Sequence, residues 1–106
     1  MITITEGLAT GGTSDAWETK FDTDDMYVDV TGTFASETFT MEYKNFDGSW
    51  VDFTFDSGGS TATFAANSNR KFSVAGGLQF RLTGDSGGGG TTDVNVRVSG
   101  HGVDRV

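Results

Sequence analysis

Apolar and polar residues alternate with a period of two along most of the chain. Five runs carry the alternation, with polar residues at the intervening positions. Their apolar positions are Met26, Val28, Val30, Gly32 and Phe34; Phe39, Met41 and Tyr43; Val51, Phe53 and Phe55; Leu78, Phe80 and Leu82; and Val94, Val96 and Val98. This period is typical of strands with one buried face, as in antiparallel sheets. No twelve-residue window has the 3.6-residue period of a helix.

The segments between these runs are rich in turn-forming residues. Asp47-Gly48 is a hairpin signal, and glycines gather at 58–59, 76–77 and 87–90. Ile2 and Ile4 indicate a short first strand, and residues 17–22 indicate another. We therefore predict a single antiparallel β-sandwich of about seven or eight short strands, with a small open β-barrel as the alternative.

The patterning divides the chain into three parts. Residues 1–16 are predicted to be an extended N-terminal arm and loop, because Gly and Thr dominate after the first few residues. Residues 17–100 hold the sandwich. Residues 101–106 are predicted to be a short C-terminal tail, with His101 exposed.

Composition excludes several kinds of chemistry. The 106 residues contain no Cys, one His and 16 Gly, so disulfides, Cys-based zinc sites and thiol catalysis are excluded. We expect no cofactor and no metal. No apolar run is long enough to span a membrane, and the first residues lack the basic and apolar regions of a signal peptide, so no membrane partner is expected.

The charge is both large and uneven. A net charge of −8 argues against nucleic acid as a partner, because phosphates would be repelled. Residues 1–56 hold 12 of the 15 acids and only two bases, whereas residues 57–106 hold three acids and five bases. This contrast favours an oriented head-to-tail or trimeric contact. The absence of Pro leaves strand edges less protected, which suits self-association edge to edge.

Four motifs between Phe34 and Val98 carry a resemblance to a known family. They are Thr38-Phe39-Thr40-Met41-Glu42-Tyr43, Asp47-Gly48-Ser49-Trp50-Val51-Asp52, Gly76-Gly77-Leu78-Gln79-Phe80-Arg81-Leu82 and Thr92-Asp93-Val94-Asn95-Val96-Arg97-Val98. In this order, with a glycine-rich loop before the last, the segment resembles small structural proteins of tailed bacteriophages. The resemblance covers 65 of the 106 residues.

The resemblance implies a non-enzymatic virion protein. The favoured role is a head decoration (cement) protein, made in the host cytoplasm, that binds the major capsid protein on the outer surface of the phage head. There it would stabilise the shell by bridging capsid subunits. The alternative, from a different functional class, is a carbohydrate- or receptor-binding β-sandwich module of a tail or fibre.

Several residues are candidates for contact with a partner. The N-terminal arm could add an edge strand to a neighbour, and Trp17, Tyr27 and Trp50 could form an aromatic platform rather than pack in the core. The remaining two candidates are the basic residues Arg70 and Lys71. The full set of predicted partner-binding residues is Ile2, Ile4, Leu8, Trp17, Tyr27, Trp50, Arg70 and Lys71. The nine Phe are expected in the core.

Three motifs suggest chemistry and are interpreted as structural instead. The acidic run 22–25 lacks the spacing of a calcium loop, and we expect it to be a solvated turn. Asp47, Asp52 and Asp56 could suggest glycoside hydrolysis, but two of them fall on the polar face of a strand, so no catalytic residue is predicted. Residues 87–90 lack the order of a phosphate loop and are predicted to be a flexible hairpin loop.

Overall fold

The chain folds into strands only, as the alternation predicts. The computed structural model describes residues 1–54 and 59–106, which form ten strands and no helix. The strands are β1 (Ile2–Leu8), β2 (Trp17–Thr19), β3 (Thr23–Thr33), β4 (Phe39–Lys44), β5 (Trp50–Asp52), β6 (Thr63–Phe64), β7 (Ser68–Val74), β8 (Gln79–Gly84), β9 (Asp93–Ser99) and β10 (Val103–Arg105). No helix of the described residues is long and apolar enough to cross a membrane.

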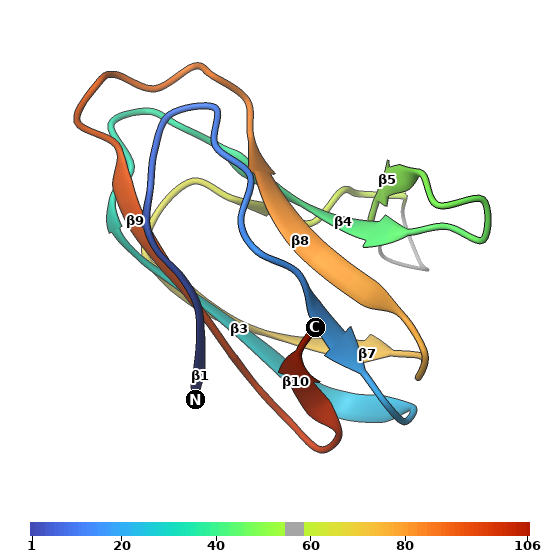
Figure 1. Cartoon of the computed structure of the whole chain (residues 1–106). Helices are drawn as coiled ribbons and strands as arrows, with labels where there is room; N and C mark the ends of the chain where they lie inside the picture. The colour runs from blue at the N-terminus through green and yellow to red at the C-terminus, as the bar shows by residue number, and fades with distance from the viewer. Residues whose placement is uncertain (55–58) are drawn as a thin grey trace.

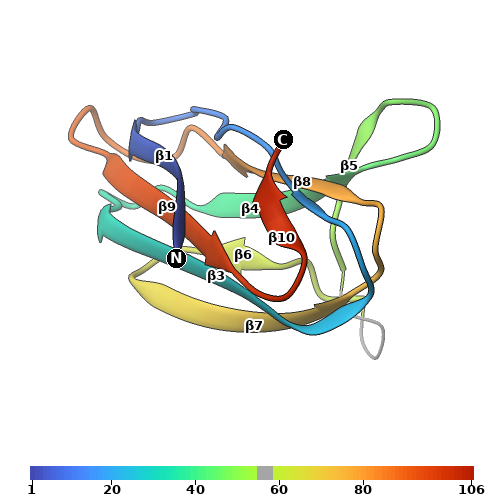
Figure 2. The same ribbon diagram turned by 60° about the horizontal axis from the view of Figure 1, so that its bottom comes forward.

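The strands form two antiparallel sheets that pack face to face, so the predicted β-sandwich is confirmed (Figures 1 and 2). One sheet has the order β1-β9-β3-β7. The other sheet has the order β10-β2-β8-β4-β5, and its sixth strand, β6, pairs with β4. The strand count exceeds the predicted seven or eight because three strands were not predicted: β7, of seven residues, and the short strands β6 and β10.

The connectivity is that of a jelly roll. β1 pairs with β9, β2 with β8, β3 with β7, and β4 with β5 and β6, so the chain resembles one long hairpin. Two further pairings, β3 with β9 and β4 with β8, roll this hairpin into two sheets. Jelly rolls of this kind build viral capsid and lectin domains, among others.

The core is built from the apolar positions of the alternating runs. The two sheets contribute Met26, Val28, Val30, Phe72, Val94, Val96 and Val98 from one side, and Trp17, Phe39, Met41, Phe64, Phe80 and Leu82 from the other. Each of these side chains is at most 2% exposed. The prediction is less accurate at β5, where Val51 and Phe53 are only partly buried. Phe55, Asp56 and the start of the predicted turn at 57–58 lie outside the described residues.

The N-terminal residues belong to the sandwich, which corrects the prediction of an arm over residues 1–16. The first strand expected at Ile2 and Ile4 is confirmed, and it continues to Leu8 as an edge strand paired with β9. The register shifts between Thr5 and Leu8, where Gly7 adopts a φ of 68°. Ile4 and Leu8, on either side of the second register shift, both face the core, at 3% and 5% exposure.

The C-terminal residues are also part of a sheet rather than a tail. Val103, Asp104 and Arg105 form β10 and pair with Thr19, Glu18 and Trp17 of β2. Val103 is buried at 7% exposure, which anchors the strand. His101 is exposed, as predicted, but its ring stacks on Phe21 at a centroid distance of 5.3 Å.

Candidate functional site

Two sets of connections lie at opposite ends of the sandwich. Four turns gather at one end, at the right and bottom of Figure 1, and we call it the turn end; they span residues 20–22, 45–49, 75–78 and 100–102. The longer connections 9–16, 34–38 and 85–92 lie at the other end. The hairpin between β4 and β5 reaches furthest from the body of the molecule (Figure 2).

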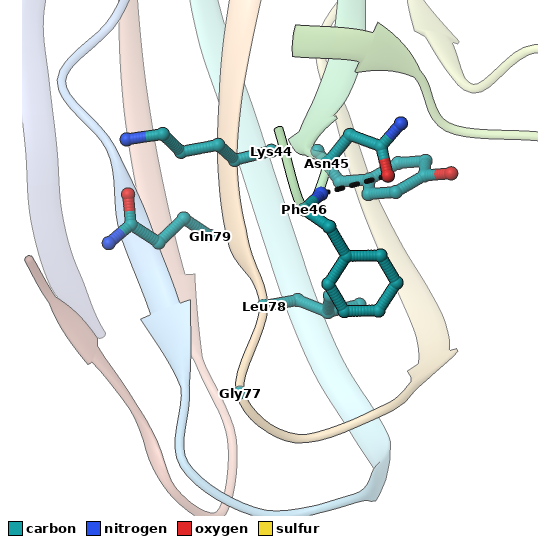
Figure 3. Close-up of a pocket in the computed structure, with 7 residues that line it drawn as sticks. Lys44, Asn45, Phe46, Gly77, Leu78 and Gln79 are labelled. Atoms are coloured by element: carbon teal, nitrogen blue, oxygen red, sulfur yellow. Dashed lines mark hydrogen bonds between the residues drawn. The ribbon is translucent and has the colours of Figure 1, made fainter. Parts of the chain in front are cut away.

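A pocket lies at the turn end, between the β4–β5 hairpin and the turn that leads into β8. It has a volume of about 230 Å³ and is lined by Tyr43, Lys44, Asn45, Phe46, Gly77, Leu78 and Gln79. The Phe46 ring lies beside the Leu78 side chain, and the Lys44 and Gln79 side chains extend away from it (Figure 3). The pocket therefore has an apolar wall, and the Lys44 ammonium and the Gln79 amide point away from the Phe46 ring.

Phe46 is the most exposed large apolar side chain among the described residues. Its relative exposure is 107%, compared with 54% for Phe21 and 37% for Tyr27. Complete exposure of a phenyl ring forgoes the burial free energy that such a side chain normally supplies, on the order of 2 kcal/mol. Nothing within the fold recovers this free energy, so Phe46 is available to a partner.

The tip that carries Phe46 is held by local hydrogen bonds. The backbone N–H of Asn45 donates to the carbonyl of Ser49 at 2.7 Å, and the N–H of Gly48 donates to the carbonyl of Asn45 at 3.0 Å. The Ser49 hydroxyl and, with a smaller effect, the Ser49 backbone N–H donate hydrogen bonds to the Asp47 carboxylate. These bonds hold the pKa of Asp47 below its usual value. Gly48 has a φ of 86°, which favours glycine at this position.

A second pocket continues the first toward β5. It also has a volume of about 230 Å³ and is lined by Tyr43, Phe53, Thr54 and Leu78. Tyr43 and Leu78 line both pockets, and the Tyr43 and Phe53 rings meet edge to face at 6.4 Å. Together the two pockets form a groove from Phe46 to Phe53, mainly apolar beside Phe46 and more polar toward Thr54, which we call the hairpin groove.

Carboxylates of the acidic run 22–25 form hydrogen bonds that connect the chain segments beside the hairpin groove. Asp22 accepts a hydrogen bond from the backbone N–H of Gly76 at 2.8 Å, and Asp24 accepts one from the Ser73 hydroxyl. Asp25 accepts hydrogen bonds from the Thr23 hydroxyl and, with a smaller effect, from the His101 backbone N–H, and these bonds lower its pKa. Each of these carboxylates accepts hydrogen bonds from different groups. Within residues 1–54 and 59–106, no group of three His, Cys, Asp or Glu side chains could hold a metal ion.

Three of the eight predicted partner-binding residues are buried in the folded chain. Ile4, Leu8 and Trp17 belong to the core, and Ile2 is partly buried against it. Trp17 is fully buried; its ring stacks on Phe80 at 6.0 Å and its indole N–H points to the sulfur of Met26 at 3.5 Å. The alternation alone could not show this, because β2 is only three residues long.

The predicted aromatic platform does not form. Tyr27 lies on the outer face of the four-stranded sheet, and Trp50 lies at the edge of the other sheet in register with Lys44. The Arg81 guanidinium covers one face of the Trp50 ring at 4.3 Å from its centroid. Trp50 is thus half-buried against a neighbour, and the three aromatics lie in three different parts of the fold.

The two basic candidates differ in their surroundings. Arg70 closes the edge of the sandwich: its guanidinium lies 5.3 Å from the centroid of Phe64 and 5.4 Å from that of Phe72, and it donates to the carbonyl of Thr63 at 2.8 Å. Lys71 is exposed on β7, next to Tyr27 of β3. Arg70 therefore packs against the fold, whereas Lys71 projects into solvent.

The opposite end contains a buried carboxylate that sequence patterning did not single out. Glu37 is 0% exposed and accepts hydrogen bonds from the backbone N–H groups of Gly11 and Gly88. The backbone N–H of Gly87, the Glu37 side chain and the N–H of Thr38 hold the pKa of Asp85 low. The glycine-rich segment predicted to be a flexible loop is thus tied to two other connections through Glu37.

The hairpin groove was missed at the sequence level because all nine Phe were assigned to the core. Phe21 and Phe46 contradict that assignment, since both are exposed. A signal was present: Phe46 immediately precedes Asp47-Gly48 and so falls in a turn rather than on the inward face of a strand.

Comparisons with protein-family models, with curated proteins and with solved structures found no match to this chain.

Proposed function

We propose that this chain is a non-enzymatic structural protein of a virus particle, which decorates the outer surface of a phage head and bridges its capsid subunits. Two observations support the proposal at the level of the fold. The motifs between Phe34 and Val98 resemble those of phage structural proteins, and the jelly-roll connectivity occurs in viral capsid domains. Because jelly-roll domains also have other functions, the proposed role depends on the candidate site rather than on the fold.

The single observation that carries the proposal is the exposed hairpin groove. Phe46 is fully exposed at the mainly apolar end of the hairpin groove, on a hairpin that projects from the sandwich. Large aromatic side chains presented in this way are the usual anchors of protein interfaces, where burial of a few of them supplies most of the binding free energy. A docking protein needs such an anchor, whereas a monomeric enzyme does not.

The proposed mechanism is the burial of surface at subunit junctions. Each decorating copy would bury Phe46 and its groove against capsid subunits, and this burial lowers the free energy of the assembled shell relative to separated subunits. Each contact can be modest, because many copies act on one shell. The sandwich contributes rigidity, so little conformational entropy is lost when the hairpin docks.

A carbohydrate- or receptor-binding module of a tail or fibre is the second candidate. Asn45 and Gln79 line the same pocket as Phe46, and amides near an aromatic ring suit hydroxyl groups of a sugar. The Gln79 side chain extends away from the ring, however (Figure 3). Against this candidate, Trp17, Tyr27 and Trp50 do not converge on one face. We therefore place the protein–protein role first.

The test is to locate the chain in a particle. Purified particles of the virus that encodes the chain should contain it by mass spectrometry, and cryo-electron microscopy should show a jelly roll on the outside of the head. Particles made without the chain should bind it again when purified protein is added and then be sedimented. Density on the tail or fibres instead of the head would favour the second candidate, and absence from the particle would overturn both.

A further inference from the structure

We infer that the turn end docks on a basic protein surface that offers a hollow for the Phe46 ring. This inference rests on the proposed function and specifies which end of the sandwich faces the capsid. The hairpin groove supplies the apolar contact, and uncompensated carboxylates around it supply the charge. The partner's chemistry follows from these two features.

The apolar contact extends beyond the hairpin. The backbone N–H of Thr19 donates to the carbonyl of Leu78 at 3.0 Å, and the N–H of Gly77 donates to the carbonyl of Thr19 at 2.6 Å. These bonds hold the turn that carries Phe21 beside the turn that carries Leu78. Phe21 is 54% exposed, so the turn end presents two exposed phenyl rings, one on each side of the β7–β8 turn.

The charge around these rings is negative and unpaired. The described residues form two ion pairs, Lys20 with Asp104 at 3.7 Å and Arg81 with Glu42 at 2.8 Å. Four carboxylates of the turn end, Asp22, Asp24, Asp25 and Asp47, accept hydrogen bonds from neutral groups instead, so their charge is not cancelled. Lys44 is the cation that opposes them in the groove.

This charge selects among possible partners. Nucleic acid and anionic membranes carry negative charge and would be repelled. A protein surface with exposed lysines and arginines would be attracted, and its encounter with the turn end would be faster at low ionic strength. A second copy of the chain is a poorer fit, because it carries the same net charge of −8 and two copies would repel each other.

The carboxylates also keep the contact rigid. Asp22 joins the β2–β3 turn to Gly76, Asp25 joins β3 to His101, and Asp47 closes the hairpin tip. All four turns are thus held by a carboxylate before a partner arrives. Preorganisation of this kind reduces the entropy lost on binding.

The experiment measures binding of the purified chain to undecorated shells assembled from the major capsid protein of the encoding virus. Phe46→Ser removes the anchor, and Val106→Ser is the matched control because Val106 is an exposed apolar residue that follows β10 and lies outside the turn end. We expect Phe46→Ser to weaken binding by about thirtyfold or more, in the range of an interface anchor, and Val106→Ser to leave it unchanged. Thermal unfolding should be nearly the same for both variants and the parent.

Charge is tested with salt and with a second pair of variants. Raising the salt concentration from about 0.05 M to about 0.5 M should weaken binding of the parent chain. Asp47→Asn should reduce this salt dependence, whereas Asp93→Asn, which changes an exposed acid on β9 at the opposite end, should not. Binding that strengthens with salt would contradict a basic partner.

The outcomes separate the inference from the proposed function. Undiminished shell binding by Phe46→Ser overturns the inference alone, and failure of the parent chain to bind shells overturns both. Binding that depends on Phe46 but is directed to glycans on an array, to neutral phosphatidylcholine vesicles or to a second copy in sedimentation also overturns the inference, because the occupant is then not a basic protein.

Discussion

The buried carboxylate of Glu37 accepts a hydrogen bond from the backbone N–H of Gly88 at 3.0 Å, joining residues 51 positions apart. The same carboxylate accepts from the N–H of Gly11. Space for it exists because Gly84 and Gly88 lack side chains; an added Cβ would meet Glu37 atoms at 2.4 and 2.7 Å. One acidic side chain therefore organises the end of the sandwich opposite the hairpin groove.

Replacement of Glu37 by Leu should destabilise the fold. Two part-buried N–H groups would lose their acceptor, and an unsatisfied donor costs about 1–3 kcal/mol when it is fully buried. We expect the free energy of unfolding in urea to fall by about 2–4 kcal/mol. Glu6→Leu, at an exposed position, is the control and should change it little. An equal effect of the two substitutions would show that Glu37 is not a structural centre.

Acid should destabilise the protein only when the pH falls below the ordinary range of carboxylate pKa values. Hydrogen bonds lower the pKa of Asp25, Asp47 and Asp85 from the usual 3.8, so each binds its proton more weakly in the folded chain than in the unfolded chain. The stability they contribute is therefore present above 3.8 and is lost as the pH falls through the lowered folded values.

Urea unfolding between about pH 7 and pH 2 measures this dependence. Stability should change little near neutrality and decline at the acid end. Asp85→Asn should make the decline shallower, because one proton-linked group is removed. A steep decline already near neutral pH would point to other titrating groups.

Removal of Arg81 should expose Trp50. The guanidinium lies 4.3 Å from the Trp50 ring centroid, and its Nε donates to Glu42 at 2.8 Å. In a Trp17→Phe background, where Trp50 is the remaining tryptophan, Arg81→Ala should shift fluorescence to longer wavelength and increase quenching by acrylamide. The expected loss of stability is about 1 kcal/mol, since the pair is partly exposed. Arg97→Ala, on the other sheet, should change neither signal.

Deletion of residues 2–8 should abolish cooperative unfolding. This segment is β1, and it supplies Ile4 and Leu8 to the core and covers one edge of β9. Ile4→Ala alone should cost about 2–4 kcal/mol, and Ile2→Ala, at a half-buried position, should cost less. Circular dichroism during thermal unfolding measures both. A truncated chain that still melts sharply would restore the view of residues 1–16 as an independent arm.

The alternation predicts much of the fold because burial in a sandwich acts strand by strand. Val94, Val96 and Val98 are fully buried, as their spacing requires, and Asp47-Gly48 forms the expected hairpin. The same reasoning fails at Trp17 and at residues 103–105. Strands of three residues contain too few positions to show a period, so only their pairing with neighbours reveals them.

The candidate site was much less predictable. Exposure of Phe46 depends on how far the β4–β5 hairpin projects, and the groove depends on Leu78, which is 32 positions away in sequence. Residue types alone favoured Trp17, Tyr27 and Trp50 because aromatic residues with polar edges are common at interfaces. Their placement in the core, on the four-stranded sheet and under Arg81 depends on the packing of strands distant in sequence.

The sequence by itself determined an all-β sandwich, the inward face of its longer strands and the acidic character of its first half. These properties follow from local alternation, turn residues and charge, which each short segment carries independently. Only the tertiary structure decided the jelly-roll order, the burial of Ile4, Leu8 and Trp17, the role of Glu37 and the position of the hairpin groove. Each of these depends on contacts between distant segments, and a pattern with a period of two specifies a face without specifying the strand that will cover it.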